Sequence, residues 1–204
     1  MKIFSSKELL LLVTPLLLFA ILTTLVFSKI ILPLDNYVYQ VVSSLITPWF
    51  TQINIAVSWL GDAPFMIPFL IVLFLYHKTR ILFFKPAVLT CVLSFLLNRT
   101  IKLILERPRP DINRLVEVSH FSFPSGHAMN NMALYTILVL LICHYAKNNS
   151  TKIYSAFVAY AFILFVGFSR VYLGVHYFSD IIAGYLLGFV VAFFVFLLKK
   201  NFSS

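Results

Sequence analysis

Six apolar runs, each close to the length that a lipid bilayer requires, divide this chain. They cover about residues 9–27, 54–76, 81–104, 128–145, 153–173 and 178–198. A helix needs roughly 20 consecutive apolar residues to cross the hydrocarbon core of a membrane. Gly61, Asp62 and Pro64 interrupt the second run, so five spans is the alternative count. Because the runs are continuous rather than alternating, they predict helices and not the strands of a membrane barrel.

The composition agrees with a chain that is surrounded by lipid. Of its 204 residues, 61% are hydrophobic and only 11% are charged, whereas soluble domains are about a quarter charged and under half apolar. We predict an all-α integral membrane bundle of about six transmembrane helices, folded as a single domain over residues 1–204. The first run is too long for the core of a signal peptide, so we expect a retained helix. Cys91 and Cys143 both fall inside apolar runs, and we expect no disulfide.

The net charge of +9 would suggest nucleic acid in a soluble protein, but its distribution here points to membrane topology, and we expect no nucleic-acid partner. If the amino terminus is cytoplasmic, the positive-inside rule accounts for nine cations: Lys2, Lys7, Lys78, Arg80, Lys85, Lys147, Lys152, Lys199 and Lys200. Seven others fall on the outer side, most of them around one loop: Lys29, Arg99, Lys102, Arg107, Arg109, Arg114 and Arg170. This local exception to the rule predicts an anion site.

Residues 33–50 have the pattern of an amphipathic helix. Apolar residues recur at helical spacing, at Leu34, Val38, Val41, Val42, Leu45, Ile46 and Trp49. The opposite face is polar and carries Asp35, Asn36, Gln40, Ser43 and Ser44. Such a helix is expected on the outer membrane surface rather than across the bilayer. There it would anchor the protein or line an entrance for lipid.

Three polar groups fall on this same outer side. The first is "KLILERPRP" at the end of the third run, where Lys102 and Arg109 are seven residues apart. Two helical turns would place them on one face if the helix continued, although Pro108 and Pro110 turn the chain into a loop. The alternative is a pair of cations that simply extend toward the membrane surface.

The second group is "PSGH", residues 124–127. Ser125 is a natural N-cap for the helix of the fourth run, and Gly126 leaves room for a ligand to approach its free N–H groups. His127 would then lie in the first turn. Taken alone, however, such a segment is more often a capped turn than a catalytic site.

The third group is "SRVYLGVHYFSD", residues 169–180. His176 and Asp180 are four residues apart, so on one helix they share a face and the carboxylate can hold an imidazole N–H. That bond selects the tautomer and leaves the other nitrogen free as a nucleophile. Arg170 precedes the expected break near Gly174. A buried pair of this kind can be structural, but ionisable groups in membranes are costly and usually functional.

Together the three groups bring cations, hydrogen-bond donors, two histidines and a carboxylate to one surface. Phosphoryl transfer needs this combination: fixed positive charge, an in-line nucleophile and an acid for the leaving oxygen. Three motifs carry it, namely Lys-x6-Arg-Pro, Pro-Ser-Gly-His and Ser-Arg-x5-His-x3-Asp. In this order and spacing they resemble the signature of the type 2 phosphatidic acid phosphatases, and the six-span layout extends the likeness over nearly the whole chain.

The resemblance implies a role for each motif residue. His176 would attack phosphorus and form a phosphohistidine, and Asp180 would orient it. His127 would protonate the departing group and then activate water. The phosphate oxygens would be bound by Lys102, Arg109, Arg170, Ser125 and the Gly126 amide. No metal or other cofactor is expected, because the three cations would supply the electrostatic stabilisation.

The resemblance also implies a substrate class. Compact bacterial members of the family act on phosphatidylglycerophosphate, phosphatidate and undecaprenyl diphosphate. We therefore expect a lipid phosphate taken from the bilayer, at the extracytoplasmic face of the plasma membrane. Glu106, Arg107 and Tyr172 adjoin motif residues and are candidates for supporting them. His120 is expected on the loop surface.

Three alternatives stay open at this stage. A transporter or channel with an anion site at its outer end would require polar residues through the depth of several spans, whereas here they cluster at one end. A zinc hydrolase built on His120, His127 and His176 would lack the compact ligand spacing of known zinc motifs. Vanadium-dependent haloperoxidases have a similar anion pocket but are soluble.

Overall fold

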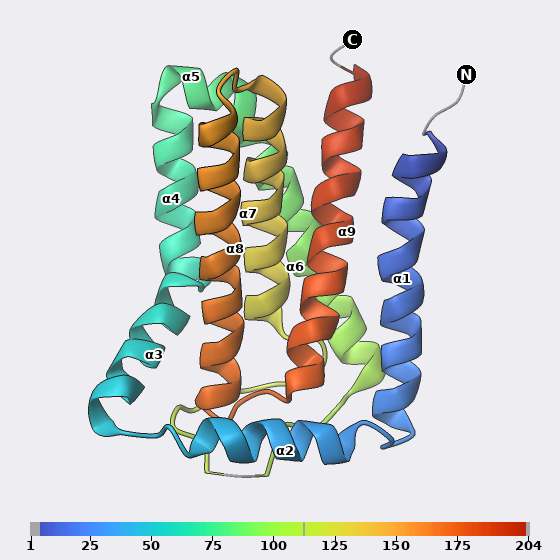
Figure 1. Cartoon of the computed structure of the whole chain (residues 1–204), viewed down its shortest axis with the longest axis vertical. Helices are drawn as coiled ribbons and strands as arrows, with labels where there is room; N and C mark the ends of the chain where they lie inside the picture. The colour runs from blue at the N-terminus through green and yellow to red at the C-terminus, as the bar shows by residue number, and fades with distance from the viewer. Residues whose placement is uncertain (1–4, 112, 203–204) are drawn as a thin grey trace.

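The computed structural model describes residues 5–111 and 113–202, and Figure 1 shows a bundle of helices with one further helix lying across its end. The elements are α1 (Ser6–Phe27), α2 (Leu32–Ser43), α3 (Pro48–Leu60), α4 (Ala63–Leu75), α5 (His77–Thr79), the π-helix η1 (Arg80–Phe84), α6 (Lys85–Leu105), α7 (Gly126–Tyr145), α8 (Asn149–Tyr172) and α9 (Phe178–Phe202). The described residues contain no β-strand. The all-α prediction is confirmed.

Five helical stretches are long and apolar enough to cross a membrane, or six if α3 and α4 form one span that is bent by 48°. The bend lies at Gly61 and Asp62, where the sequence predicted an irregularity. Asp62 is the N-cap residue of α4, and its side chain accepts a hydrogen bond from the Ala63 N–H at 2.8 Å. With six spans both chain ends belong on one side, and Figure 1 shows both at the end opposite α2.

The amphipathic helix differs from the prediction in its extent and in its buried face. α2 ends at Ser43, because Thr47 is extended and Pro48 opens α3 in a new direction. Val42 packs into the core beneath the helix, whereas Leu34 and Val41 are exposed. Asp35, predicted on the polar face, is only 1% exposed. Its burial has an electrostatic reason, a contact with Arg107, which is described below.

The surface of the bundle is rich in apolar side chains. Leu10 and Leu17 on α1, and Phe157 and Leu164 on α8, are all more than half exposed. A protein surrounded by water rarely exposes contiguous apolar surface on this scale. Together with the spans, these residues identify a multi-pass membrane protein.

The helices α7 and α9 form the most closely packed pair at the centre of the bundle. Two glycines of α9 allow the approach: a Cβ at Gly188 would lie 2.4 Å from the Met129 carbonyl oxygen, and one at Gly184 would lie 2.8 Å from that of Ser125. Small residues four apart let membrane helices come close in this way. The Ser125 N–H also donates to the Asp180 carbonyl at 3.0 Å, so the first turns of both helices lie side by side.

Candidate active site

A pocket of about 490 Å³ opens near the first turns of α7 and α9. Six of the eight predicted site residues line it: Lys102, Arg109, Gly126, His127, Arg170 and His176. Asp180 and Ser125 are fully buried and are not part of its lining. The three motifs, which lie far apart in the sequence, therefore meet at one place.

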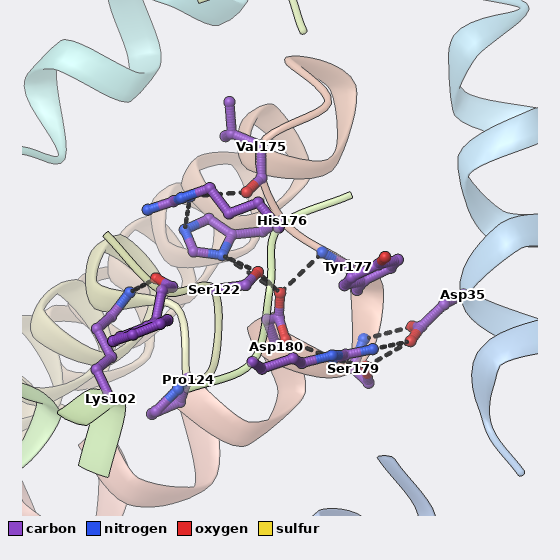
Figure 2. Close-up of polar contacts among 12 residues, drawn as sticks. Asp35, Lys102, Ser122, Pro124, Val175, His176, Tyr177, Ser179 and Asp180 are labelled. Carbon is purple, nitrogen blue, oxygen red and sulfur yellow. Dashed lines mark hydrogen bonds and ion pairs between the residues drawn. The ribbon is translucent and has the colours of Figure 1, made fainter. Parts of the chain in front are cut away.

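His176 and Asp180 are in contact, although not as neighbours on one helix. His176 lies in the loop before α9, and Asp180 lies in the first turn of that helix. The carboxylate is turned back toward the loop, because its Oδ2 accepts the Tyr177 N–H at 2.9 Å. This Oδ2 is 3.4 Å from His176 Nδ1 (Figure 2).

Ser122 is a member of this cluster that the motifs did not reveal. Its Oγ donates a short hydrogen bond to Asp180 Oδ2 and lies 3.3 Å from His176 Nδ1 (Figure 2). The hydroxyl can thus accept a hydrogen bond from Nδ1–H while it donates one to the carboxylate. In the sequence, only its closeness to the Pro-Ser-Gly-His motif, three residues before Ser125, could have suggested that Ser122 belongs to the site.

The other ring nitrogen of His176 faces a cation. Arg109 Nη1 lies 3.3 Å from His176 Nε2, and a guanidinium can only donate. Nε2 is therefore the acceptor and Nδ1 carries the proton. Burial, followed by the nearby charges of Arg109, Lys102 and Arg170, holds the pKa of His176 well below its ordinary value. The imidazole is neutral at neutral pH, and the unprotonated Nε2 accepts a hydrogen bond from Arg109.

Backbone carbonyls hold two of the pocket's cations in place. Lys102 Nζ donates to the Phe121 carbonyl at 2.6 Å, and Arg109 donates to the carbonyls of His120 and Ser119 at 2.9 and 3.0 Å. Lys102 and Arg109 do not share a helix face, because α6 ends at Leu105, Glu106 adopts a left-handed conformation and the chain continues as a loop, as the prolines indicated. The loop 119–121 brings the two cations together instead. Neutral carbonyls direct them without cancelling their charge.

Arg170 and Ser125 each carry a buried polar atom without a hydrogen-bond partner among the described residues: Nε of the arginine and Oγ of the serine. Arg170 uses Nη1 to donate a short hydrogen bond to Ser58 of α3. Buried polar atoms nearly always have a partner, so an anion in the pocket would suit Arg170. Ser125 is the N-cap residue of α7 by position, but its side chain makes no capping bond within the described chain.

His127 lines the pocket from the first turn of α7, as expected. Its Nε2 lies 3.8 Å from Oδ2 of Asp62, at the α3–α4 bend. Asp62 was interpreted only as an interruption of a span, because its proximity to His127 depends on how the bent span packs. Gly126 lies close to α6, where a Cβ would come within 3.2 Å of Asn98 Oδ1.

The neighbours of the motifs have distinct places. Arg107 contacts the far side of Asp180, with Nη1 2.5 Å from Oδ1. Tyr172 supports the fold, because its hydroxyl accepts the Thr47 N–H at 3.3 Å where α3 begins. Glu106 is the exposed C-cap residue of α6. His120 is exposed but lies at the rim of the pocket.

The geometry bears on two of the alternatives. Every buried charged or histidine side chain in the described chain lies near this pocket or next to Arg107: Asp35, Arg107, Arg170, His176 and Asp180. A transport path would need such groups along its length. Among residues 5–111 and 113–202, no three His, Cys, Asp or Glu side chains are grouped as a zinc site requires.

Comparison with known proteins gives one consistent result. The family model described as "PAP2 superfamily" matches residues 83–204. Phosphatidylglycerophosphatase B of Bacillus subtilis is 31% identical over 186 residues, which is 88% of this chain and 90% of that protein. The crystal structure of a transmembrane PAP2-type phosphatidylglycerolphosphate phosphatase from Bacillus subtilis superposes with a TM-score of 0.84 at 29% identity, covering 94% of this chain and 97% of that one.

A second solved structure shares the fold. LpxE of Aquifex aeolicus matches 81% of this chain and 95% of its own, with a TM-score of 0.64 at 24% identity. The family match covers more than half of the chain, and the Bacillus relative covers most of it. This chain belongs to the PAP2 superfamily and is a membrane lipid phosphatase.

Proposed function

We propose that this phosphatase hydrolyses lipid mono- and diphosphates through a phosphohistidine at His176, without a metal. The observation that carries the proposal is the arrangement of the His176 ring. Its Nε2 faces Arg109, its Nδ1 is backed by Ser122 and Asp180, and the residue lines the pocket. His127 lines the same pocket, and in this proposal it acts as the acid.

The steps follow from these positions. Lys102, Arg109, Arg170 and the Gly126 amide bind the phosphate oxygens, with Ser125 next to them in the same turn. His176 Nε2 then forms a bond to phosphorus as the bond to the lipid oxygen breaks, and His127 gives its proton to that oxygen. In the second half, His127 takes a proton from water, the water oxygen bonds to phosphorus, and the bond to Nε2 breaks. The cations stabilise the charge of both transition states.

The proposed substrates follow from what the relatives are named for and from which lipids could reach the pocket. The relatives found include a phosphatidylglycerophosphatase, so phosphatidylglycerophosphate and phosphatidate are candidates. If the pocket faces outward from the plasma membrane, undecaprenyl diphosphate left by cell-wall polymer transfer is directly accessible there. Phosphatidylglycerophosphate, made inside, would first have to cross. We therefore favour a broad lipid phosphatase that accepts diphosphates.

The test is phosphate release in detergent with excess EDTA, with undecaprenyl diphosphate and phosphatidylglycerophosphate as parallel substrates. We compare the wild type with His176→Ala and, as a matched control, His144→Ala at the opposite end of α7. Release should survive EDTA, persist in the control and fall at least about 10³-fold in His176→Ala, since the nucleophile is lost. The ratio of the two wild-type rates identifies the preferred lipid.

Two results would contradict the proposal. Activity that EDTA abolishes would show that a metal takes part, and full activity in His176→Ala would show that another group attacks phosphorus. Quenching the reaction of a radiolabelled lipid phosphate with alkaline SDS adds a direct readout. An acid-labile, base-stable label on the wild type and its absence from His176→Ala are expected for a phosphohistidine.

A further inference from the structure

Asp35 is a buried carboxylate that the mechanism above does not use. It belongs to α2, the helix across the end of the bundle, and only 1% of the residue is exposed. Its Oδ1 accepts the Ser179 N–H at 2.8 Å, and its Oδ2 lies 2.9 Å from Arg107 Nη2 and 2.6 Å from Ser179 Oγ. Figure 2 shows it joined to the α9 end of the site. So complete a set of contacts fixes the carboxylate in one orientation.

Arg107 connects Asp35 to the candidate active site. One guanidinium nitrogen contacts Asp35 Oδ2 and the other lies 2.5 Å from Asp180 Oδ1. The guanidinium also stacks over the Tyr177 ring, 4.0 Å from its centre. Because a guanidinium is planar and rigid, fixing one edge of it fixes the other. Asp35 thereby determines where Arg107 meets Asp180.

The charges of Asp35, Arg107 and Asp180 do not cancel. Two carboxylates share one guanidinium, and the three side chains are at most 8% exposed. With both carboxylates ionised the cluster carries a net charge of −1, and this charge lies on the Nδ1 side of His176. An Arg107–Asp180 pair alone would be neutral.

An excess negative charge at this position has a chemical use. When Nε2 attacks phosphorus while Nδ1 keeps its proton, the neutral imidazole becomes a phosphorylated imidazolium. Positive charge develops on a ring that already lies among Arg109, Lys102 and Arg170. A fixed negative charge behind the ring offsets that repulsion, and it acts strongly because the site is buried.

We infer that Asp35 is a positioning residue for phosphoryl transfer, which acts on His176 through Arg107 and Asp180 and supplies the negative charge that the phosphorylated ring requires. The inference rests on the proposed phosphohistidine mechanism. It makes α2 a working part of the enzyme and not only an anchor at the membrane surface.

A purely structural role makes a different prediction. Asp35 also accepts the first-turn N–H of α9 at Ser179, and such caps stabilise helices. Loss of a cap would lower thermal stability, but it would leave the rate of the folded enzyme unchanged. The decisive readout is therefore the chemical step itself, measured on folded protein.

The experiment measures phosphohistidine formation in single turnovers, by rapid quench with a radiolabelled lipid phosphate. Asp35→Asn keeps the shape and removes the charge. Asp111→Asn is the matched control, because Asp111 is exposed and lines a second, smaller cavity together with Asp35. We expect Asp35→Asn to slow the step at least about tenfold with little change in the substrate concentration for half-maximal rate, and Asp111→Asn to match the wild type. Asp35→Glu keeps the charge and should recover part of the rate.

A double-mutant cycle tests the route through Asp180. If Asp35 acts through that carboxylate, adding Asp35→Asn to Asp180→Asn causes no further loss. If the two losses multiply, or if folded Asp35→Asn matches Asp111→Asn, the inference is overturned. If Asp35→Asn does not fold, Arg107→Lys replaces it, since one ammonium cannot bridge both carboxylates as a guanidinium does. A wild-type rate in Arg107→Lys would equally overturn the inference.

The outcome for the proposed function is separate. If the wild type forms no phosphohistidine, the proposed mechanism fails. If the wild type forms it and the Asp35 variants do so at the same rate, only the inference fails.

Discussion

The two ring nitrogens of His176 have opposite surroundings. Nδ1 lies beside Ser122 and Asp180, and Nε2 lies beside Arg109. The first surroundings hold a proton and the second repel one. These surroundings suit the nucleophile that we propose, because they favour a neutral ring with its proton on Nδ1 before any substrate binds.

This state of His176 can be observed directly by NMR. In detergent-solubilised protein with ¹⁵N-labelled histidine, we expect the His176 ring to titrate with a midpoint well below the ordinary 6.5. The sign follows from burial and neighbouring cations, which disfavour the imidazolium, so the ring takes up its proton only under more acidic conditions. His176→Gln assigns the signal, and the protein unfolded in SDS provides the reference. A midpoint at or above 6.5 would contradict this account.

The sequence pointed to the candidate site residues that belong to the three polar motifs between apolar runs. It did not reveal Ser122, Asp62 or Asp35, because each acts through a contact that only folding creates. Asp35 is the clearest case: its pattern placed it on a solvated helix face, and its partner Arg107 is 72 residues away. A side chain's position on one helix cannot show what another helix brings to it.

At the scale of elements, hydrophobic length predicted the membrane helices well. The fifth run, predicted at about 153–173, is α8, Asn149–Tyr172. The errors lie where chain direction changes. Residues 33–50 form α2 and the start of α3, because the extended Thr47 and the helix-opening Pro48 separate them. The amphipathic spacing of apolar residues continues across this turn, so the spacing alone does not reveal where the turn lies.

The close contact between α7 and α9 gives a prediction at this scale. In Gly188→Ala the new Cβ would lie 2.4 Å from the Met129 carbonyl oxygen, and neither backbone can yield locally. We expect a loss of stability of about 1–3 kcal/mol, seen as a lower midpoint of thermal unfolding in detergent. Phe194→Ala, which trims a partly exposed side chain of the same helix, is the control and should cost less. An unchanged midpoint in Gly188→Ala would show that the helices can separate freely.

At the scale of the whole molecule, charge and architecture agree on an orientation. The start of α1 and the end of α9 lie at the end of the bundle opposite α2 (Figure 1). The pocket lies near the first turns of α7 and α9. Eight of the nine cations predicted to be cytoplasmic lie at the end opposite α2, and the ninth, Lys2, lies outside the described residues. The seven others belong to the side of the pocket. From the positive-inside rule we therefore predict that the pocket faces outward.

Labelling of intact cells tests this orientation. In a background of Cys91→Ala and Cys143→Ala, a membrane-impermeant maleimide should label Arg114→Cys in intact cells, because Arg114 is exposed in the loop beside the pocket. Lys147→Cys, exposed between α7 and α8, should react only after the cells are opened. The reverse pattern would place the pocket in the cytoplasm and remove the argument from substrate access.

The glycine contact between α7 and α9 also bears on which lipids the enzyme can accept. His127 and Asp180 lie in the first turns of two helices whose backbones are in contact, and His176 lies two residues before the second helix. The spacing between the proposed acid and the proposed nucleophile is therefore set by two main chains and does not depend on the size of a head group. The rim, by contrast, consists of loop residues 117–120 and the bend at Gly61 and Asp62. We therefore expect differences in lipid selectivity to arise from changes at the rim. The reacting centre should keep the same geometry whatever the rest of the substrate is.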